Sequence, residues 1–143
     1  MFVEQISIFL ENKSGRLAEV TRILGDSDID ISALSIADTT DFGILRLIVN
    51  NPQKALSVLK EQGFTVSSTN VIAIGVQDKP GGLSKALEIL DKNKLGIEYM
   101  YAFVSKTEDE ALVLLRVEEP ARAVEVLKEN GISVLSANQV YKL

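Results

Sequence analysis

The chain contains two glycine turns of the same chemistry, and this internal repeat constrains its fold more than any other feature. The turn at 12–17 is Asn-Lys-Ser-Gly-Arg-Leu, and the turn at 78–83 is Asp-Lys-Pro-Gly-Gly-Leu. Three residue types recur between them at one constant offset: Lys13, Gly15 and Leu17 match Lys79, Gly81 and Leu83. Self-similarity at a fixed period indicates repeated structural units, so the two halves should share one fold.

The first half predicts a strand, a helix, a hairpin, a second helix and a further strand. Its apolar residues first alternate, as in a strand with one buried face, and then recur at helical spacing. Ser14 is available to cap the first helix, and Gly25 to end it. Pro52 fits the first turn of the second helix, since it has no N–H to satisfy. The expected elements are strand 3–10, helix 17–24, strands 29–37 and 43–49 around a polar turn at 38–41, a helix from Pro52 closed by Gly63, and a strand from 64.

The second half repeats this order, with two extra residues in its hairpin turn. Its expected elements are strand 71–76, helix 83–90, strand 95–104, a polar turn at 106–110, strand 111–117, a helix from Pro120 and a final strand over 132–143. Each half is therefore β-α-β-β-α-β over roughly 70 residues, the ferredoxin-like arrangement of a four-stranded antiparallel sheet with two helices on one face. The expected fold is α+β, with one domain over 1–69 and a second over 70–143.

The third expected strand carries apolar residues on both faces, although helices cover only one face of such a sheet. The surplus predicts a second buried surface, formed between the repeats or between two chains, and hence a homodimer. The two sets that alternate along this strand are Ile44, Arg46 and Ile48 on one face, and Leu45, Leu47 and Val49 on the other.

Composition excludes several classes of function. The net charge of −5, from 20 acidic and 15 basic residues, offers no attractive field for a phosphate backbone, so nucleic acid is not an expected partner. The chain has no cysteine and no histidine, which removes thiolate and imidazole catalysis and the common zinc ligand sets. We therefore expect no enzyme activity, metal or cofactor. No signal or membrane-spanning run is evident, so we expect a cytoplasmic protein that does not contact a membrane.

The chain resembles the ACT domain, a small regulatory module of amino-acid metabolism, and the resemblance spans both halves. The family pattern has Asn or Asp, one further residue, often Pro-Gly, and then an apolar residue that opens the first helix, as at 12–17 and 78–83. Serine-regulated members carry a polar residue 18 positions after the Asn or Asp. That position is Asp30 in the first repeat and Gly96 in the second.

The resemblance implies that the turns bind a small amino acid. A helix N-terminus offers backbone N–H groups and a positive dipole end to a carboxylate, while Asn12 and Asp30 could accept hydrogen bonds from an ammonium group. The second turn keeps Asp78 but lacks a side chain at Gly96, so we expect its pocket to be weaker, differently used or structural. The expected ligand-binding residues are Asn12, Lys13, Ser14, Gly15, Arg16, Leu17, Asp30, Asp78, Lys79, Pro80, Gly81, Gly82 and Leu83.

Each of these features has a purely structural alternative. Glycine turns between strands and helices occur for conformational reasons alone, and Asp30 could be a solvated loop residue. Lys13, Arg16 and Lys79 are interpreted as solvated charges, with closure over a ligand carboxylate as the second possibility. Two functions stay open: a regulatory sensor that binds an amino acid near the interface of the repeats and acts on a partner such as an amino-acid-metabolism enzyme, and a ligand-free interaction or oligomerisation module.

Overall fold

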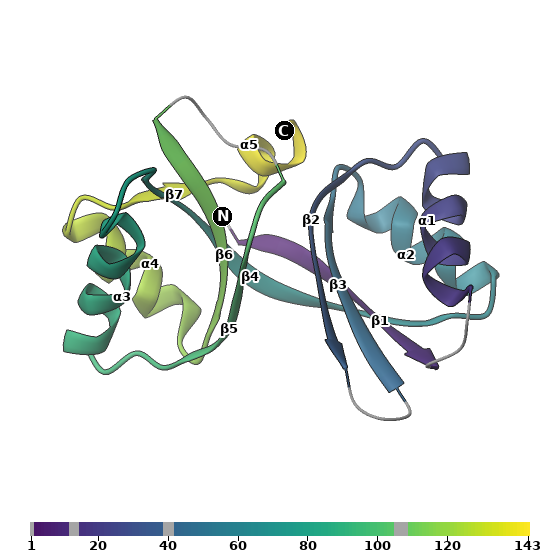
Figure 1. Ribbon diagram of the computed structural model, residues 1–143, viewed down its shortest axis with the longest axis horizontal. Helices are drawn as coiled ribbons and strands as arrows, with labels where there is room; N and C mark the ends of the chain where they lie inside the picture. Colours follow the sequence, from purple (N-terminus) through teal and green to yellow (C-terminus); the bar gives the residue numbers. More distant parts are fainter. Residues whose placement is uncertain (1, 12–14, 39–41, 105–108) are drawn as a thin grey trace. The chain divides into compact units, whose positions relative to one another are not determined.

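The computed structural model describes residues 2–11, 15–38, 42–104 and 109–143. Contacts between Cα atoms divide the chain into two compact units, each of which is described by itself (Figure 1). The N-terminal unit comprises Glu4–Thr69 with Tyr141–Leu143, and the C-terminal unit comprises Asn70–Val140 with Met1–Val3. Within the described residues, none of the helices combines the length and the apolar character needed to cross a bilayer.

The N-terminal unit is a helix-covered antiparallel sheet. Its strands follow the order β2-β3-β1-β4, and β3 pairs antiparallel with both β1 and β2. Helices α1 and α2 lie on one face of this sheet (Figure 1). The elements are β1 (Val3–Glu11), α1 (Arg16–Asp26), β2 (Ile31–Asp38), β3 (Phe42–Val49), α2 (Pro52–Glu61) and β4 (Thr65–Gln77).

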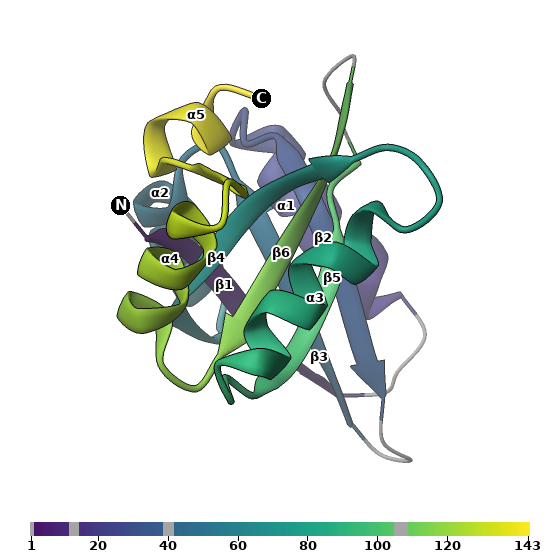
Figure 2. The ribbon, with the colours of Figure 1, turned by 90° about the vertical axis from the view of Figure 1, so that its left-hand side faces the viewer.

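The C-terminal unit repeats that arrangement. Its strands follow the order β4-β6-β5, and β7 pairs with β4. Figure 2 faces this unit and shows α3 and α4 in front of its sheet. The remaining elements are α3 (Gly82–Lys92), β5 (Ile97–Ala102), β6 (Glu110–Val117), α4 (Pro120–Glu129), β7 (Ser133–Leu135) and α5 (Ala137–Tyr141). The expected fold of two ferredoxin-like repeats is thus confirmed.

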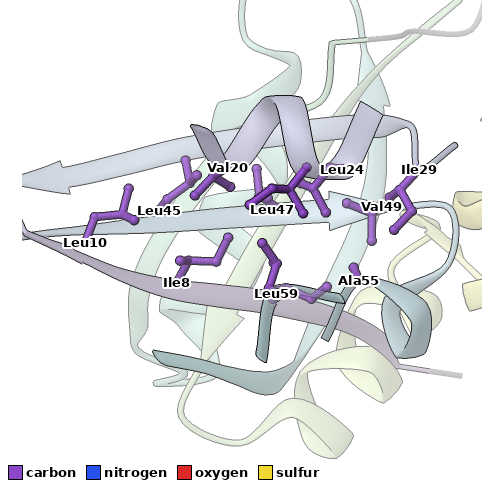
Figure 3. Packing of buried hydrophobic residues seen from close by; sticks show 12 residues of the cluster. Ile8, Leu10, Val20, Leu24, Ile29, Leu45, Leu47, Val49, Ala55 and Leu59 are labelled. Carbon is purple, nitrogen blue, oxygen red and sulfur yellow. The ribbon is translucent and has the colours of Figure 1, made fainter. Parts of the chain in front are cut away.

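Each unit has its own hydrophobic core between its helices and its sheet. In the N-terminal unit, β1 and β3 direct alternate residues toward α1 and α2 (Figure 3). Leu24 of α1 and Leu90, its equivalent in α3, are both 0% exposed and belong to the two separate cores. The residues of the first core are Ile6, Ile8, Leu10, Val20, Ile23, Leu24, Ile29, Leu45, Leu47, Val49, Ala55 and Leu59.

The opposite face of the N-terminal sheet is also apolar, as the alternation in β3 predicts. Ile48 on this face is fully buried, whereas Phe9 and Phe42 remain 47% and 41% exposed. The two phenylalanine rings stack with their centroids 4.9 Å apart. This stack leaves an aromatic surface on the side of the sheet that α1 and α2 do not cover.

The expected final strand over 132–143 is wrong. The strand β7 ends at Leu135, and the helix α5 follows. The cause is a capping box: the Gln139 N–H donates to Ser136 Oγ at 3.2 Å, and the Ser136 N–H donates to Gln139 Oε1 at 2.8 Å. The first repeat has Ser68 and Val71 at these positions, so it lacks the reciprocal cap. There the chain continues as β4, one strand of 13 residues where we expected two shorter ones.

Tyr141, near the end of the chain, forms a hydrogen bond with the backbone at the start of the N-terminal unit. The Glu4 N–H donates to its phenol oxygen at 2.9 Å, and burial raises the pKa of Tyr141 above its ordinary value of 10.0. Tyr141→Phe should lower the free energy of unfolding by about 1 kcal/mol, because the Glu4 N–H loses its acceptor.

The contribution of Tyr141 to stability should fall at alkaline pH, because burial disfavours the phenolate. Because the folded pKa of Tyr141 is the higher one, its contribution is complete below the unfolded pKa of about 10 and is lost as the pH rises through the folded value. Urea denaturation of wild type and Tyr141→Phe at neutral pH and above pH 10 measures this pH dependence. The other tyrosines are common to both proteins, so their titration cancels in the difference. A difference in stability that stays constant with pH would contradict the assignment.

Candidate functional site

The two glycine turns adopt the same backbone conformation. Gly15 (φ 86, ψ −8) and Gly81 (φ 88, ψ −10) are left-handed and are the N-cap residues of α1 and α3. A Cβ atom on either glycine would meet nothing within 4 Å, so the positive φ rather than crowding selects glycine. Asn12, Lys13 and Ser14 of the first turn lie outside the described residues. The N-cap of α1 is Gly15, not Ser14 as the sequence suggested.

The first turn of each helix presents backbone N–H groups that no described side chain caps. The Glu19 N–H donates to the Gly15 carbonyl at 2.9 Å, and the Lys85 N–H donates to the Gly81 carbonyl at 3.1 Å. The amides before these two have no intrahelical acceptor by geometry, and they stand at the positive end of the helix dipole. Each turn can therefore hold the carboxylate of a small molecule.

The second turn closes tightly on its own backbone. The Lys79 N–H donates to the Gln77 carbonyl at 2.9 Å, and the Gly82 N–H donates to the Lys79 carbonyl at 3.0 Å. A Cβ atom on Gly82 would overlap the Gln77 carbonyl oxygen, so this position has room for glycine only. Asp78, Lys79 and Pro80 are exposed, and Leu83 is half-buried.

Arg16 occupies the position in the first turn that Gly82 occupies in the second, and it is more than a solvated charge. Its guanidinium lies over the Phe64 ring, 5.6 Å from the centroid, and forms an ion pair with Glu19 at 3.2 Å. The side chain is 37% exposed. The first turn thus has an arginine whose side chain is held by two contacts, at the position where the second turn has glycine.

A cavity of about 290 Å³ adjoins the first turn within the N-terminal unit. Phe9 and Phe42, the stacked pair, form one wall, and Phe64 under Arg16 contributes another. The sequence analysis missed these aromatic residues; the outward position of Phe9 in the first strand was the available signal. The residues around the cavity are Phe9, Leu10, Glu11, Arg16, Phe42, Gln62, Gly63, Phe64 and Thr65.

Leu83 lies at a shallow apolar depression of the C-terminal unit, on the surface of α3. The depression has a volume of about 430 Å³, and its lining residues are Leu83, Ser84, Leu87, Glu88 and Asp91. Leu17, the equivalent of Leu83 on α1, is 43% exposed. The two leucines expected at the site therefore present apolar surface at the start of each helix.

The structure does not bring Asp30 to the first turn within one unit. Gly15 precedes α1 and Asp30 follows it, and a helix of 11 residues separates its ends by about 16 Å. Asp30 is exposed, its N–H donates to Asn50 Oδ1 at 3.0 Å, and the Asn50 N–H donates back to the Asp30 carbonyl at 3.1 Å. One small ligand cannot touch both Gly15 and Asp30 of the same unit.

The acidic residues near the ends of α1 have structural roles. Asp26 forms an ion pair with Arg22 at 3.8 Å, and Asp28 adopts a positive φ of 59° in the turn that follows the helix. In the parts of the chain that the structure describes, no three acidic side chains gather into a metal site.

Comparison with known proteins identifies the family and the fold. The family model described as an ACT domain pair matches residues 1–143. A Bacteroides thetaiotaomicron protein of known structure is 45% identical, with a TM-score of 0.94 over 100% of this chain and 98% of its own. A search of curated proteins found no match.

Two structures of lower identity share the fold. The regulatory subunit of aspartate kinase from Thermus thermophilus, in its ligand-free form, is 17% identical with a TM-score of 0.64, over 91% of this chain and 94% of its own. Escherichia coli aspartokinase III, in complex with lysine and aspartate, is 19% identical with a TM-score of 0.52, over 89% of this chain and 30% of its own.

Proposed function

This chain belongs to the family of ACT domain pairs, and from that premise we propose that it is a non-catalytic regulatory protein that binds a small amino acid at its first glycine turn. Two proteins of the same fold support this proposal: one is the regulatory subunit of an aspartate kinase, and the other is an aspartokinase in complex with amino acids. The partner that receives the signal would be an enzyme of amino-acid metabolism.

The observation that carries the proposal is a set of hydrogen-bond donors at the start of α1, beside a cavity. The N–H groups after Gly15, which no described side chain caps, and the guanidinium of Arg16, which also pairs with Glu19, offer a carboxylate two kinds of donor. The adjoining volume of about 290 Å³ suits a molecule the size of an amino acid. Donors held in place before binding cost little reorganisation, so this turn favours an α-carboxylate.

The acidic residue of the site would come from a second copy of the chain. Asp30 lies at the far end of α1 from Gly15, so two N-terminal units packed with antiparallel α1 helices would bring each Asp30 to the other's turn. The strand β2 lies at the end of the strand order, where its outer edge is available. Apolar side chains for such a contact lie on β2 and α1: Leu34 is 47%, Ile36 45% and Leu17 43% exposed. The proposed protein is therefore a homodimer.

A thermal-shift screen of the twenty amino acids, tested one by one, measures the proposed activity. An amino acid present at 100 times its dissociation constant should add about 2.7 kcal/mol to the free energy of unfolding. Asp30→Ala should weaken its binding by about 1.5–3 kcal/mol, because the ammonium group loses a charged hydrogen bond. A folded protein that responds to none of the twenty contradicts sensing, and unchanged affinity in Asp30→Ala removes Asp30 from the site.

A ligand-free interaction module is the second candidate. The exposed Phe9–Phe42 stack and the apolar side chains of β2 favour it, because exposed apolar groups of this kind mark protein contacts. Amino-acid screens would then be silent, while a partner enzyme would co-purify with wild type and be lost from Phe9→Ser.

A further inference from the structure

The two units place an acidic group at the same point of the fold by means of different residues. Asp30 before β2 has its equivalent in Gly96 before β5, and Asn50 after β3 has its equivalent in Glu118 after β6. The first repeat therefore has the pair Asp and Asn, and the second has the pair Gly and Glu. From the missing side chain at Gly96 we expected the second pocket to be weaker, differently used or structural.

In the N-terminal unit, Asn50 forms hydrogen bonds with the backbone of Asp30 and leaves the Asp30 carboxylate exposed. Its Oδ1 accepts from the Asp30 N–H at 3.0 Å, and its N–H donates to the Asp30 carbonyl at 3.1 Å. Across the described residues, the Asp30 carboxylate takes part in no hydrogen bond or ion pair. It can therefore receive a cationic group from outside the unit.

In the C-terminal unit the equivalent backbone hydrogen bond is present, but the carboxylate belongs to the residue after β6 and not to the residue before β5. The Glu118 N–H donates to the Gly96 carbonyl at 3.2 Å, the counterpart of the Asn50–Asp30 bond. A Cβ atom on Gly96 would lie 2.9 Å from both Cδ and Oε1 of Glu118. The Glu118 carboxylate thus covers the place where a side chain at 96 would stand. It is exposed and, among the described residues, has no ion pair.

We propose that Glu118 is the ammonium-binding residue of the second repeat and does there what Asp30 does in the first. This inference rests on the proposed amino-acid binding. The second pocket, expected to be weaker, differently used or structural, would then be differently used, because both repeats combine a glycine turn with a carboxylate at the far end of the following helix. With the carboxylate supplied by a second copy of the chain in each case, the homodimer has two sites per chain and binds two amino acids per chain.

Isothermal titration calorimetry of the full-length protein tests this, with the twenty amino acids as probes in turn. Wild type should bind two molecules per chain of the amino acid that responds. Glu118→Gln should weaken one of the two sites roughly ten- to a hundredfold, and Asp30→Asn should weaken the other by a similar factor. Glu125→Gln, which removes the same charge from the exposed surface of α4, should leave both sites unchanged.

A double variant separates a binding role from a structural one. Gly96→Asp with Glu118→Asn rebuilds the Asp–Asn pair of the first repeat. It should fit, because Gly96 has an ordinary φ and the shorter Asn leaves the space that Glu118 fills. This variant should recover the affinity that Glu118→Gln loses. One molecule bound per chain, unaffected by Glu118→Gln, overturns the proposal while amino-acid binding stands. No binding by any of the twenty overturns both.

Discussion

Leu90→Ala is expected to lower the free energy of unfolding of the C-terminal unit by about 2–5 kcal/mol. Leu90 is 0% exposed on α3, and its side chain is part of the core against β4 and β6. Truncation removes buried apolar surface and leaves a cavity that the sheet cannot fill, because the strands are held by their hydrogen-bond registers. Leu24→Ala should cost the N-terminal unit a similar amount, since Leu24 is the equivalent residue of a separate core.

Hydrogen exchange measured residue by residue, combined with urea denaturation, locates each loss. In Leu90→Ala, the amides of β6 and α4 should lose protection, and in Leu24→Ala those of β3 and α2. Val104→Ala is the control, because Val104 is 71% exposed and its truncation should change stability by well under 1 kcal/mol. A loss below 1 kcal/mol in Leu90→Ala would show that the C-terminal core can collapse around the cavity.

The fold was predictable because its evidence lies in local patterns. Alternation in β1 and β3 and helical spacing in α1 set which residues face the core, and the repeat requires the halves to agree. The end of the chain was mispredicted for an equally local reason. Ser136 and Gln139 cap each other's backbone, and this starts a helix where the strand would otherwise continue. Ser68, the equivalent of Ser136 in the first repeat, lies within the strand β4.

The site was predictable only where the backbone determines it. Glycine at the start of each helix indicated a strand-to-helix turn, and in both turns this glycine has a positive φ. Asp30 directly precedes β2, and spacing along the chain does not tell how far it lies from Gly15, because a helix stands between them. The contact of Arg16 with Phe64 and that of Glu118 with Gly96 join residues far apart in sequence, so no local pattern reveals them.

Gly82→Ala is expected to destabilise the C-terminal unit by about 3 kcal/mol, the upper end of what overpacking costs. Its new methyl group would overlap the Gln77 carbonyl oxygen, and a backbone atom cannot move aside as a flexible side chain can. The turn would have to open, with loss of the hydrogen bond from the Gly82 N–H to the Lys79 carbonyl. Urea denaturation measures the loss of stability.

Two matched variants isolate this cause. Gly81→Ala should cost about 1–2 kcal/mol, because the new methyl group meets no atom and the only penalty is the positive φ of this position. Arg16→Ala alters the same helix position in the first turn and should cost less than 1 kcal/mol, because it removes only an exposed ion pair and the contact with Phe64. If Gly82→Ala costs no more than Gly81→Ala, the overlap with the Gln77 carbonyl does not destabilise the second turn. The two turns differ in chemistry because Gly82 must fit against Gln77, while the equivalent position in the first repeat has room for an arginine that can reach a ligand.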